Sequence, residues 1–258
     1  WKRRGDTGPV LVLVDGAMGH RGFGPMPAVA DHLADAFRVV LYDRRGRGDS
    51  GDTAPFHRDR EVEDLAAVVE AQGEQVALFG ISSGAMLALR GAAAIPAIQQ
   101  VVVFEPPMYL DGTFEPDPPD FRERIDTLLA AGDRDGAVSL FMRVVGVPRF
   151  GVAMMRWMWW VWPKLCATAH TLPYDFAQLG DTHRGGPLPE EIGDVLGSVG
   201  VPAHVLVGGA SPAYMEHAAE VVAGRVAGAR LTTIPGATHT AGAGTLGPFV
   251  RRALGGEP

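Results

Sequence analysis

The residues best suited to chemistry lie around Ser82, in the sequence Gly80-Ile81-Ser82-Ser83-Gly84. The apolar run before this sequence predicts a buried strand, and the Ala-, Leu- and Met-rich run after it predicts a helix. A serine on such a strand-to-helix turn has a strained backbone, and the chain folds back so closely that only glycines fit two positions to either side. The pattern favours Ser82 as a nucleophile over the alternative, a glycine-rich turn with a capping serine.

Two further residues could assist that nucleophile. Ser83 opens the predicted helix, so its backbone N–H and the positive end of the helix dipole would stabilise an oxyanion beside the Ser82 hydroxyl. His239 ends a glycine-containing loop after the last predicted strand, and an imidazole has a pKa suited to both acid and base roles. His239 is therefore a candidate general base, the alternative being an incidental surface histidine.

The elements that would position these residues alternate between strand and helix. Continuous apolar runs predict strands buried on both faces, at residues 10–14, 38–42, 75–79, 101–104, 203–207 and 230–234. Helical spacing between them predicts helices, among them residues 25–37, 61–72 and 213–226. This order predicts an α/β fold, a mostly parallel sheet with helices on both faces.

The alternation stops after residue 110. Helical segments without a convincing strand follow, at residues 121–131, 134–145, 151–162 and, more loosely, 174–179. We therefore predict a core made of residues 1–110 and 192–258, with residues 111–191 inserted as a helical cap.

The chain from Pro9 onward resembles the α/β-hydrolase fold superfamily, as a bacterial, cap-bearing member similar to serine hydrolases. The sequence around Ser82 resembles the nucleophile elbow of that family, and the loop ending in His239 resembles the loop that carries the catalytic histidine. The loop of residues 42–50 is similar to an Asp-x-Arg-Gly-x-Gly-x-Ser loop of bacterial members. Its three arginines could bind phosphate, but its aspartates and glycines favour a structural, self-paired loop.

The resemblance implies a second oxyanion donor, the backbone N–H of Ala17. The family usually has His-Gly before this position, whereas this chain has Asp15 and Gly16. A carboxylate beside a developing oxyanion would oppose it unless Asp15 points away or is protonated. Asp15 either bonds to nearby N–H groups as a turn residue or contacts substrate or water. We assign Asp15 and Met18, in the same loop, to the predicted substrate site.

The resemblance also implies an acid that orients His239. The family usually has an aspartate where this chain has Ser211, but some members carry the acid at the end of the preceding strand, where this chain has Glu105. A carboxylate that ends an apolar strand is costly to bury without a partner. We predict Glu105 as this acid; the alternative is that it bonds only to backbone amides or to an arginine of residues 44–47. Asp175 and Asp181 are weaker candidates.

Four of the five tryptophans cluster on the predicted cap, within residues 156–162. Such aromatic surface over an active-site mouth favours a large apolar or aromatic, polyketide-like substrate over a sugar or a phosphate. Some of these rings could instead form the core of the cap. We assign Trp157, Trp159 and Trp160 to the predicted substrate site.

The composition of the chain excludes some classes of binding partner. The net charge of −7 argues against nucleic acid, and no basic run indicates a membrane surface. No apolar segment approaches the roughly 20 residues that span a bilayer. The single cysteine, Cys166, excludes an internal disulfide and fits a reducing compartment, so we expect a cytoplasmic protein. No metal, nucleotide or redox cofactor is implied, and the oligomeric state is not indicated.

The resemblance therefore implies a serine hydrolase that cleaves an ester, thioester or lactone of a hydrophobic small molecule. Ser82 would attack the carbonyl, His239 would transfer the proton, and the N–H groups of Ala17 and Ser83 would hold the oxyanion. Two alternatives stay open. One is a biosynthetic tailoring enzyme that performs a cyclisation, epoxide opening or elimination, and the other is a small-molecule binding protein with a vestigial site.

Overall fold

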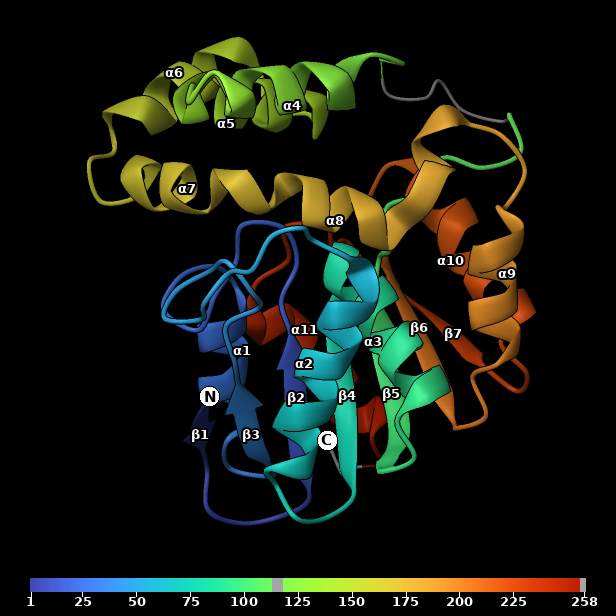
Figure 1. Ribbon diagram of the computed structural model, residues 1–258. Coiled ribbons are helices and arrows are strands. Elements are labelled where there is room, and N and C mark those ends of the chain that lie inside the picture. Colours follow the sequence, from blue (N-terminus) through green and yellow to red (C-terminus); the bar gives the residue numbers. More distant parts are fainter. Residues whose placement is uncertain (113–117, 256–258) are drawn as a thin grey trace.

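The computed structural model describes residues 1–112 and 118–255 (Figure 1). Within these residues, seven strands form one sheet in the order β1-β3-β2-β4-β5-β6-β7. β1 runs antiparallel to β3, and every other neighbouring pair is parallel. The strands are β1 Lys2–Arg4, β2 Val10–Val14, β3 Arg38–Leu41, β4 Val76–Ile81, β5 Ile98–Phe104, β6 Ala203–Gly208 and β7 Arg230–Ile234.

Helices cover both faces of the sheet, as predicted, because successive residues of each strand point to opposite faces. In β2, the valines at 10, 12 and 14 belong to a buried apolar cluster that also includes side chains of α2, α3, α9 and α10. The leucines at 11 and 13 pack with α1 and α11 on the other face. These helices are α1 Met26–Leu33, α2 Arg58–Glu70, α3 Ser83–Ala94, α9 Glu190–Gly197, α10 Ala213–Arg225 and α11 Ala243–Ala253.

A separate helical layer lies over the edge of the sheet where the parallel strands end (Figure 1). Its buried side chains form a core of their own, which also includes Met18 from the loop after β2. Within the described part of the chain, this layer consists of α4 Phe121–Ala130, α5 Arg134–Val144, α6 Arg149–Trp157, α7 Trp162–Thr168, η1 Ala169–Thr171, α8 Leu172–Leu179 and η2 Gly180–Arg184.

The prediction of one helix over residues 151–162 is wrong for its second half. α6 ends at Trp157, and a new helix, α7, begins at Trp162 after a turn. Pro163 explains the break, since proline lacks the N–H that a helix interior needs but is tolerated in a first turn. Trp159 and Trp160 therefore lie in the turn between two helices. Among the described residues, no helix combines the length and the apolar character needed to cross a membrane.

Candidate active site

Ser82 lies directly between β4 and α3, in the strained backbone conformation that the sequence predicts. Its φ of 55° and ψ of −130° are unfavourable for a residue with a side chain. A Cβ atom built on Gly80 would lie only 2.5 Å from the carbonyl oxygen of Gly84, and one on Gly16 would lie 2.9 Å from Ser82 Cβ. The close approach of these backbones accounts for the glycines and presents Ser82 beside the loop after β2.

Glu105 and His239 are brought together from the ends of β5 and β7. Glu105 is fully buried, and its Oε2 lies 2.8 Å from Nδ1 of His239. Its other oxygen, Oε1, accepts a 2.7 Å hydrogen bond from the N–H of Gly208. The imidazole also lies nearly parallel to the Phe104 ring, with 6.3 Å between the ring centroids. The carboxylate therefore orients the imidazole through Nδ1.

Position 211, where the resemblance implies an aspartate that orients the histidine, has no carboxylate in this chain. Ser211 is there instead, and its buried Oγ has no hydrogen-bond partner in the part of the chain that the structure describes. A Cβ on Gly208 would lie 2.7 Å from that Oγ, so the serine packs beside the backbone that binds Glu105. Asp181 forms an ion pair with Arg184 at the surface, and Asp175 binds arginines, so neither takes the place of Glu105 beside His239.

Asp15 is buried at the end of β2. Its Oδ1 accepts a 2.9 Å hydrogen bond from the N–H of Gly16, as expected for a turn residue. Its Oδ2 has no partner among the described residues, and burial raises the pKa of the carboxyl to about 7. A side chain on Gly19 would collide with this carboxylate, so the loop folds tightly over it. The carboxyl group is thus enclosed and easily protonated.

Replacing Asp15 with asparagine tests this protonation. Because the folded-state pKa lies above the ordinary value of 3.8, ionisation is costlier in the folded protein. The contribution of Asp15 to the free energy of unfolding should therefore fall as pH rises towards 7 and then level off. The asparagine side chain mimics the protonated form, so the variant should gain about 3 kcal/mol relative to wild type between about pH 5 and pH 8. Urea denaturation at both pH values measures the gain, and a pH-independent difference would contradict it.

The remaining predicted substrate residues lie in two different settings. Met18, with a φ of 62°, is buried in the core of the helical layer, in the same apolar cluster as Phe121 and Ile125, so it packs the loop after β2 against that layer. Burial of this apolar side chain stabilises the contact between the loop and the layer, and the substrate contact predicted for Met18 stays a prediction. Ala17 is partly buried at the edge of the same core.

The three assigned tryptophans are at the surface of the helical layer. Trp157, Trp159 and Trp160 expose 89%, 78% and 53% of their surface, while Trp162 is buried and donates from its indole N–H to Asp135 at 2.7 Å. Trp159 and Trp160 contact each other edge to face, with 5.8 Å between their centroids. Of the clustered tryptophans, only Trp162 belongs to the core of the layer.

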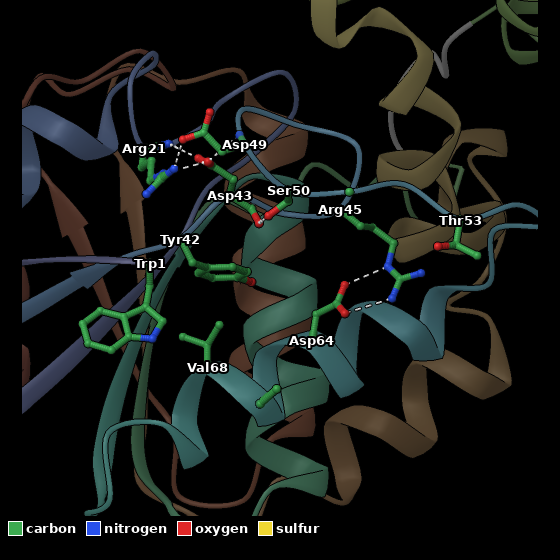
Figure 2. Close-up of a pocket in the computed structure, with 12 residues that line it drawn as sticks. Trp1, Arg21, Tyr42, Asp43, Arg45, Asp49, Ser50, Thr53, Asp64 and Val68 are labelled. Carbon is green, nitrogen blue, oxygen red and sulfur yellow. Dashed lines mark hydrogen bonds and ion pairs between the residues drawn. The ribbon is translucent and has the colours of Figure 1, made fainter.

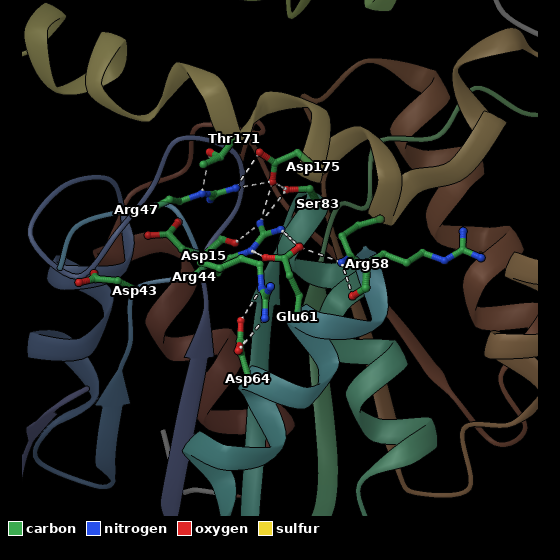
Figure 3. A network of polar contacts seen from close by, with 12 residues as sticks. Asp15, Asp43, Arg44, Arg47, Arg58, Glu61, Asp64, Ser83, Thr171 and Asp175 are labelled. Atoms are coloured by element: carbon green, nitrogen blue, oxygen red, sulfur yellow. Dashed lines mark hydrogen bonds and ion pairs between the residues drawn. The ribbon is translucent and has the colours of Figure 1, made fainter. Parts of the chain in front are cut away.

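The loop after β3 is held by paired charges, as the sequence favours, but its partners lie largely outside the loop. Arg45 pairs with Asp64 of α2 at 2.7 Å. Arg44 is buried and pairs with Glu61 of α2 and with Asp175 of α8 (Figure 3). Arg47 is also buried and pairs with Asp175. The sequence did not predict these ion pairs with α2 and α8. The only signal was the number of arginines in the loop, and that number does not identify their partners.

A cavity of about 410 Å³ lies on the outer side of this loop (Figure 2). Two ion pairs brace its rim, between Arg21 and Asp43 and between Arg45 and Asp64. Ser82 is not among its lining residues. Among residues 1–112 and 118–255, no group of three or more His, Cys, Asp or Glu side chains could hold a metal ion.

Comparison with known proteins identifies the family to which this chain belongs. The sequence model of the alpha/beta hydrolase family matches residues 11–248. An alpha/beta hydrolase from Sphaerobacter thermophilus is 43% identical, with a TM-score of 0.86, over 98% of this chain and 95% of that chain. A hydrolase from Pseudomonas aeruginosa is 24% identical with a TM-score of 0.73, over 98% of this chain and 93% of that chain, and shares the fold.

The curated relatives match shorter stretches. Lipase LipV of Mycobacterium tuberculosis is 32% identical over 140 residues, which are 51% of this chain and 48% of the lipase. The chain spans about half the length of the curated relatives it matches. The family model extends much further and covers the loop after β2, the turn at Ser82 and the loop of His239. The chain belongs to the alpha/beta hydrolase family.

Proposed function

We propose that the protein is a serine hydrolase that cleaves an ester, thioester or lactone of a hydrophobic small molecule through an acyl-enzyme. The observation that carries this proposal is the 2.8 Å contact between Glu105 Oε2 and His239 Nδ1. It joins a buried carboxylate to an imidazole at the same edge of the sheet as the strained turn of Ser82. A serine, an acid and a histidine, here in the chain order Ser82, Glu105 and His239, are the parts that acyl transfer uses.

In the proposed reaction, His239 Nε2 takes the proton of Ser82 while the serine oxygen attacks the substrate carbonyl. The N–H groups of Ala17 and Ser83 stabilise the resulting oxyanion. The carbonyl carbon then loses its bond to the leaving oxygen or sulfur, which receives the proton from His239. Water attacks the acyl-enzyme by the same route, releases the acid and restores Ser82. Glu105 stabilises the imidazolium that forms in both halves.

Asp15 fits this mechanism better as an enclosed, partly neutral acid than as a carboxylate at the oxyanion. Burial raises the pKa of Asp15 to about 7. Near neutral pH, a large share of the molecules therefore lacks the negative charge that would oppose the oxyanion. The aspartate is thus compatible with an oxyanion donor at Ala17, two residues further along the chain.

The helical layer over the strand ends is proposed as a cap that covers the substrate. Its core of apolar side chains, shared with Met18, continues into the loop that carries Ala17. An apolar cover of this kind supports a hydrophobic acyl group over a charged or sugar substrate.

A fluorophosphonate probe tests the proposed nucleophile, because it labels a serine only where a base and an oxyanion site activate it. We expect wild type to be labelled, Ser82→Ala to be unlabelled, and His239→Ala to be labelled at least 100-fold more slowly. A folded wild-type protein that resists the probe would contradict the proposal. Labelling that persists in Ser82→Ala would place the nucleophile elsewhere.

The exposed tryptophans give a separate prediction about the substrate. Replacing Trp159 or Trp160 with alanine should raise KM for an apolar ester about fivefold, the loss of roughly 1 kcal/mol of aromatic contact. The unfolding temperature should hardly change, because exposed substitutions cost within about 0.5 kcal/mol. Trp162→Ala is the matched control: this ring is buried and hydrogen-bonded, so its loss should lower stability. Unchanged KM in both exposed variants would remove these rings from the substrate site.

A further inference from the structure

Four charged side chains meet beneath the helical layer (Figure 3). Arg44, Arg47, Glu61 and Asp175 each expose 2% or less of their surface. Arg44 donates to both oxygens of Glu61 at 2.8 Å and to Asp175 Oδ1 at 2.7 Å. Arg47 donates to both oxygens of Asp175 at 2.8 and 2.7 Å. Two positive and two negative groups thus cancel, which is the condition for burying them.

The same arginines also hold the loop that carries Ala17. Arg44 Nη1 donates to the carbonyl oxygen of Asp15 at 3.2 Å. Arg47 Nη1 donates to the carbonyl oxygens of Gly16 at 2.5 Å and Gly19 at 3.3 Å. These carbonyls lie on both sides of Ala17 in the chain. The orientation of the Ala17 peptide therefore depends on where the two guanidinium groups lie.

Asp175 reaches the other proposed oxyanion donor directly. The hydroxyl of Ser83 donates a 2.6 Å hydrogen bond to Asp175 Oδ1. Ser83 is buried at the start of α3, so this side chain ties the first turn of that helix to α8 of the helical layer. The Asp175 carboxylate is thus hydrogen-bonded to Ser83. Through Arg44 and Arg47 it is also linked to the loop that carries Ala17.

We propose that Asp175 is a positioning residue that sets the spacing of the Ala17 and Ser83 N–H groups, so that the seating of α8 assembles the oxyanion site. This inference rests on the proposed function. An oxyanion donor acts over a narrow range of distance, and a misplacement of about 1 Å can cost on the order of 100-fold in rate. A contact that holds both donors from one point controls that distance.

Arg45 provides an internal comparison. It belongs to the same loop and makes the same two-bond pairing, with Asp64 at 2.7 and 2.9 Å. It donates otherwise to the carbonyl oxygen of Arg60, on α2, and to neither the Ala17 loop nor the helical layer. The Arg45–Asp64 pair is more exposed, so its loss should cost less stability. If both ion pairs only held the loop, however, neither loss should act on the rate through the oxyanion donors, whereas the proposed coupling makes Asp175 alone matter for the rate.

Ser83→Ala is the sharpest test, because it removes the 2.6 Å hydrogen bond to Asp175, together with a longer one at 3.4 Å from Arg44 Nη1, and leaves the backbone N–H and all ion pairs in place. With p-nitrophenyl butyrate as substrate, we expect kcat to fall about tenfold and KM to stay within twofold. The inhibition constant of phenylboronic acid, which forms a tetrahedral anion on an active serine, should rise about tenfold. The pH dependence of kcat should be unchanged, because Glu105 and His239 are untouched.

Asp175→Asn should lower kcat further, and Asp64→Asn, the control, should leave kcat and boronic acid inhibition within twofold of wild type. If Asp175→Asn does not fold, Ser83→Ala still decides the question. Wild-type kcat and inhibition in Ser83→Ala would overturn the coupling and leave the proposed function standing. A wild-type enzyme that hydrolyses no ester and resists the fluorophosphonate probe would overturn the proposed function, and the coupling with it.

Discussion

Replacing Ser82 with alanine should lower kcat by about 10⁴- to 10⁶-fold, the range expected when a serine nucleophile is removed. The fold should survive, because alanine accepts the backbone angles at this position no worse than serine does. Steady-state kinetics with p-nitrophenyl butyrate measures the loss, and circular dichroism with thermal unfolding checks the fold.

A Ser82→Ala enzyme that keeps its turnover within tenfold of wild type would contradict an acyl-enzyme. A reaction without a covalent intermediate, such as a cyclisation or an epoxide opening on the same scaffold, would then be the better explanation. Mass spectrometry of the wild-type protein during turnover provides an independent check, since an acyl-enzyme adds the mass of the acyl group to the chain.

Replacing Glu105 with glutamine should lower kcat by about 10⁴-fold, as removal of the charge behind a catalytic histidine does in serine enzymes. Glutamine has the same shape and can still accept the hydrogen bond from Gly208, but it supplies no negative charge to His239. Its amide N–H can also turn towards Nδ1 and stabilise the wrong tautomer. KM should change little, because Glu105 lies behind the histidine.

Ser211→Ala is the matched control for this experiment. Ser211 occupies the place of the usual family acid, and its buried hydroxyl has no hydrogen-bond partner in the described residues. Its removal should leave kcat within twofold and should not lower stability, since no bond is lost. If Ser211→Ala loses activity and Glu105→Gln retains it, Glu105 is not the residue that orients His239, and the Ser211 hydroxyl takes its place.

The layout of the core could be predicted from the sequence because each part of it has a local cause. Apolar runs identify strands buried on both faces, and the glycines around Ser82 identify a turn with no space for side chains. Glu105 was also predictable: a carboxylate at the end of an apolar strand needs a partner, and His239 ends a loop at the same edge of the sheet. Its catalytic role stays a prediction.

The contacts of the helical layer could not be predicted in the same way. Asp175 lies 131 residues from Arg44, and no periodic pattern links two polar residues so far apart. The break in the predicted helix at Trp157 had a signal in Pro163, which cannot continue a helix interior. The exposure of Trp159 follows from that break, because a turn at the surface places its side chains differently from a helix packed on a core.

The buried charges around Asp175 limit which helical layers from relatives could replace the one in this protein. A chimaera that took residues 118–184 from a relative would keep Arg44 and Arg47 in the core domain but would need a carboxylate at the position of Asp175. Without it, the buried guanidinium groups would lose a counter-charge, at a cost of about 3–5 kcal/mol. A recombination experiment that seeks a new substrate range should therefore treat Arg44, Arg47 and Asp175 as one inherited unit and vary the exposed turn around Trp159 instead.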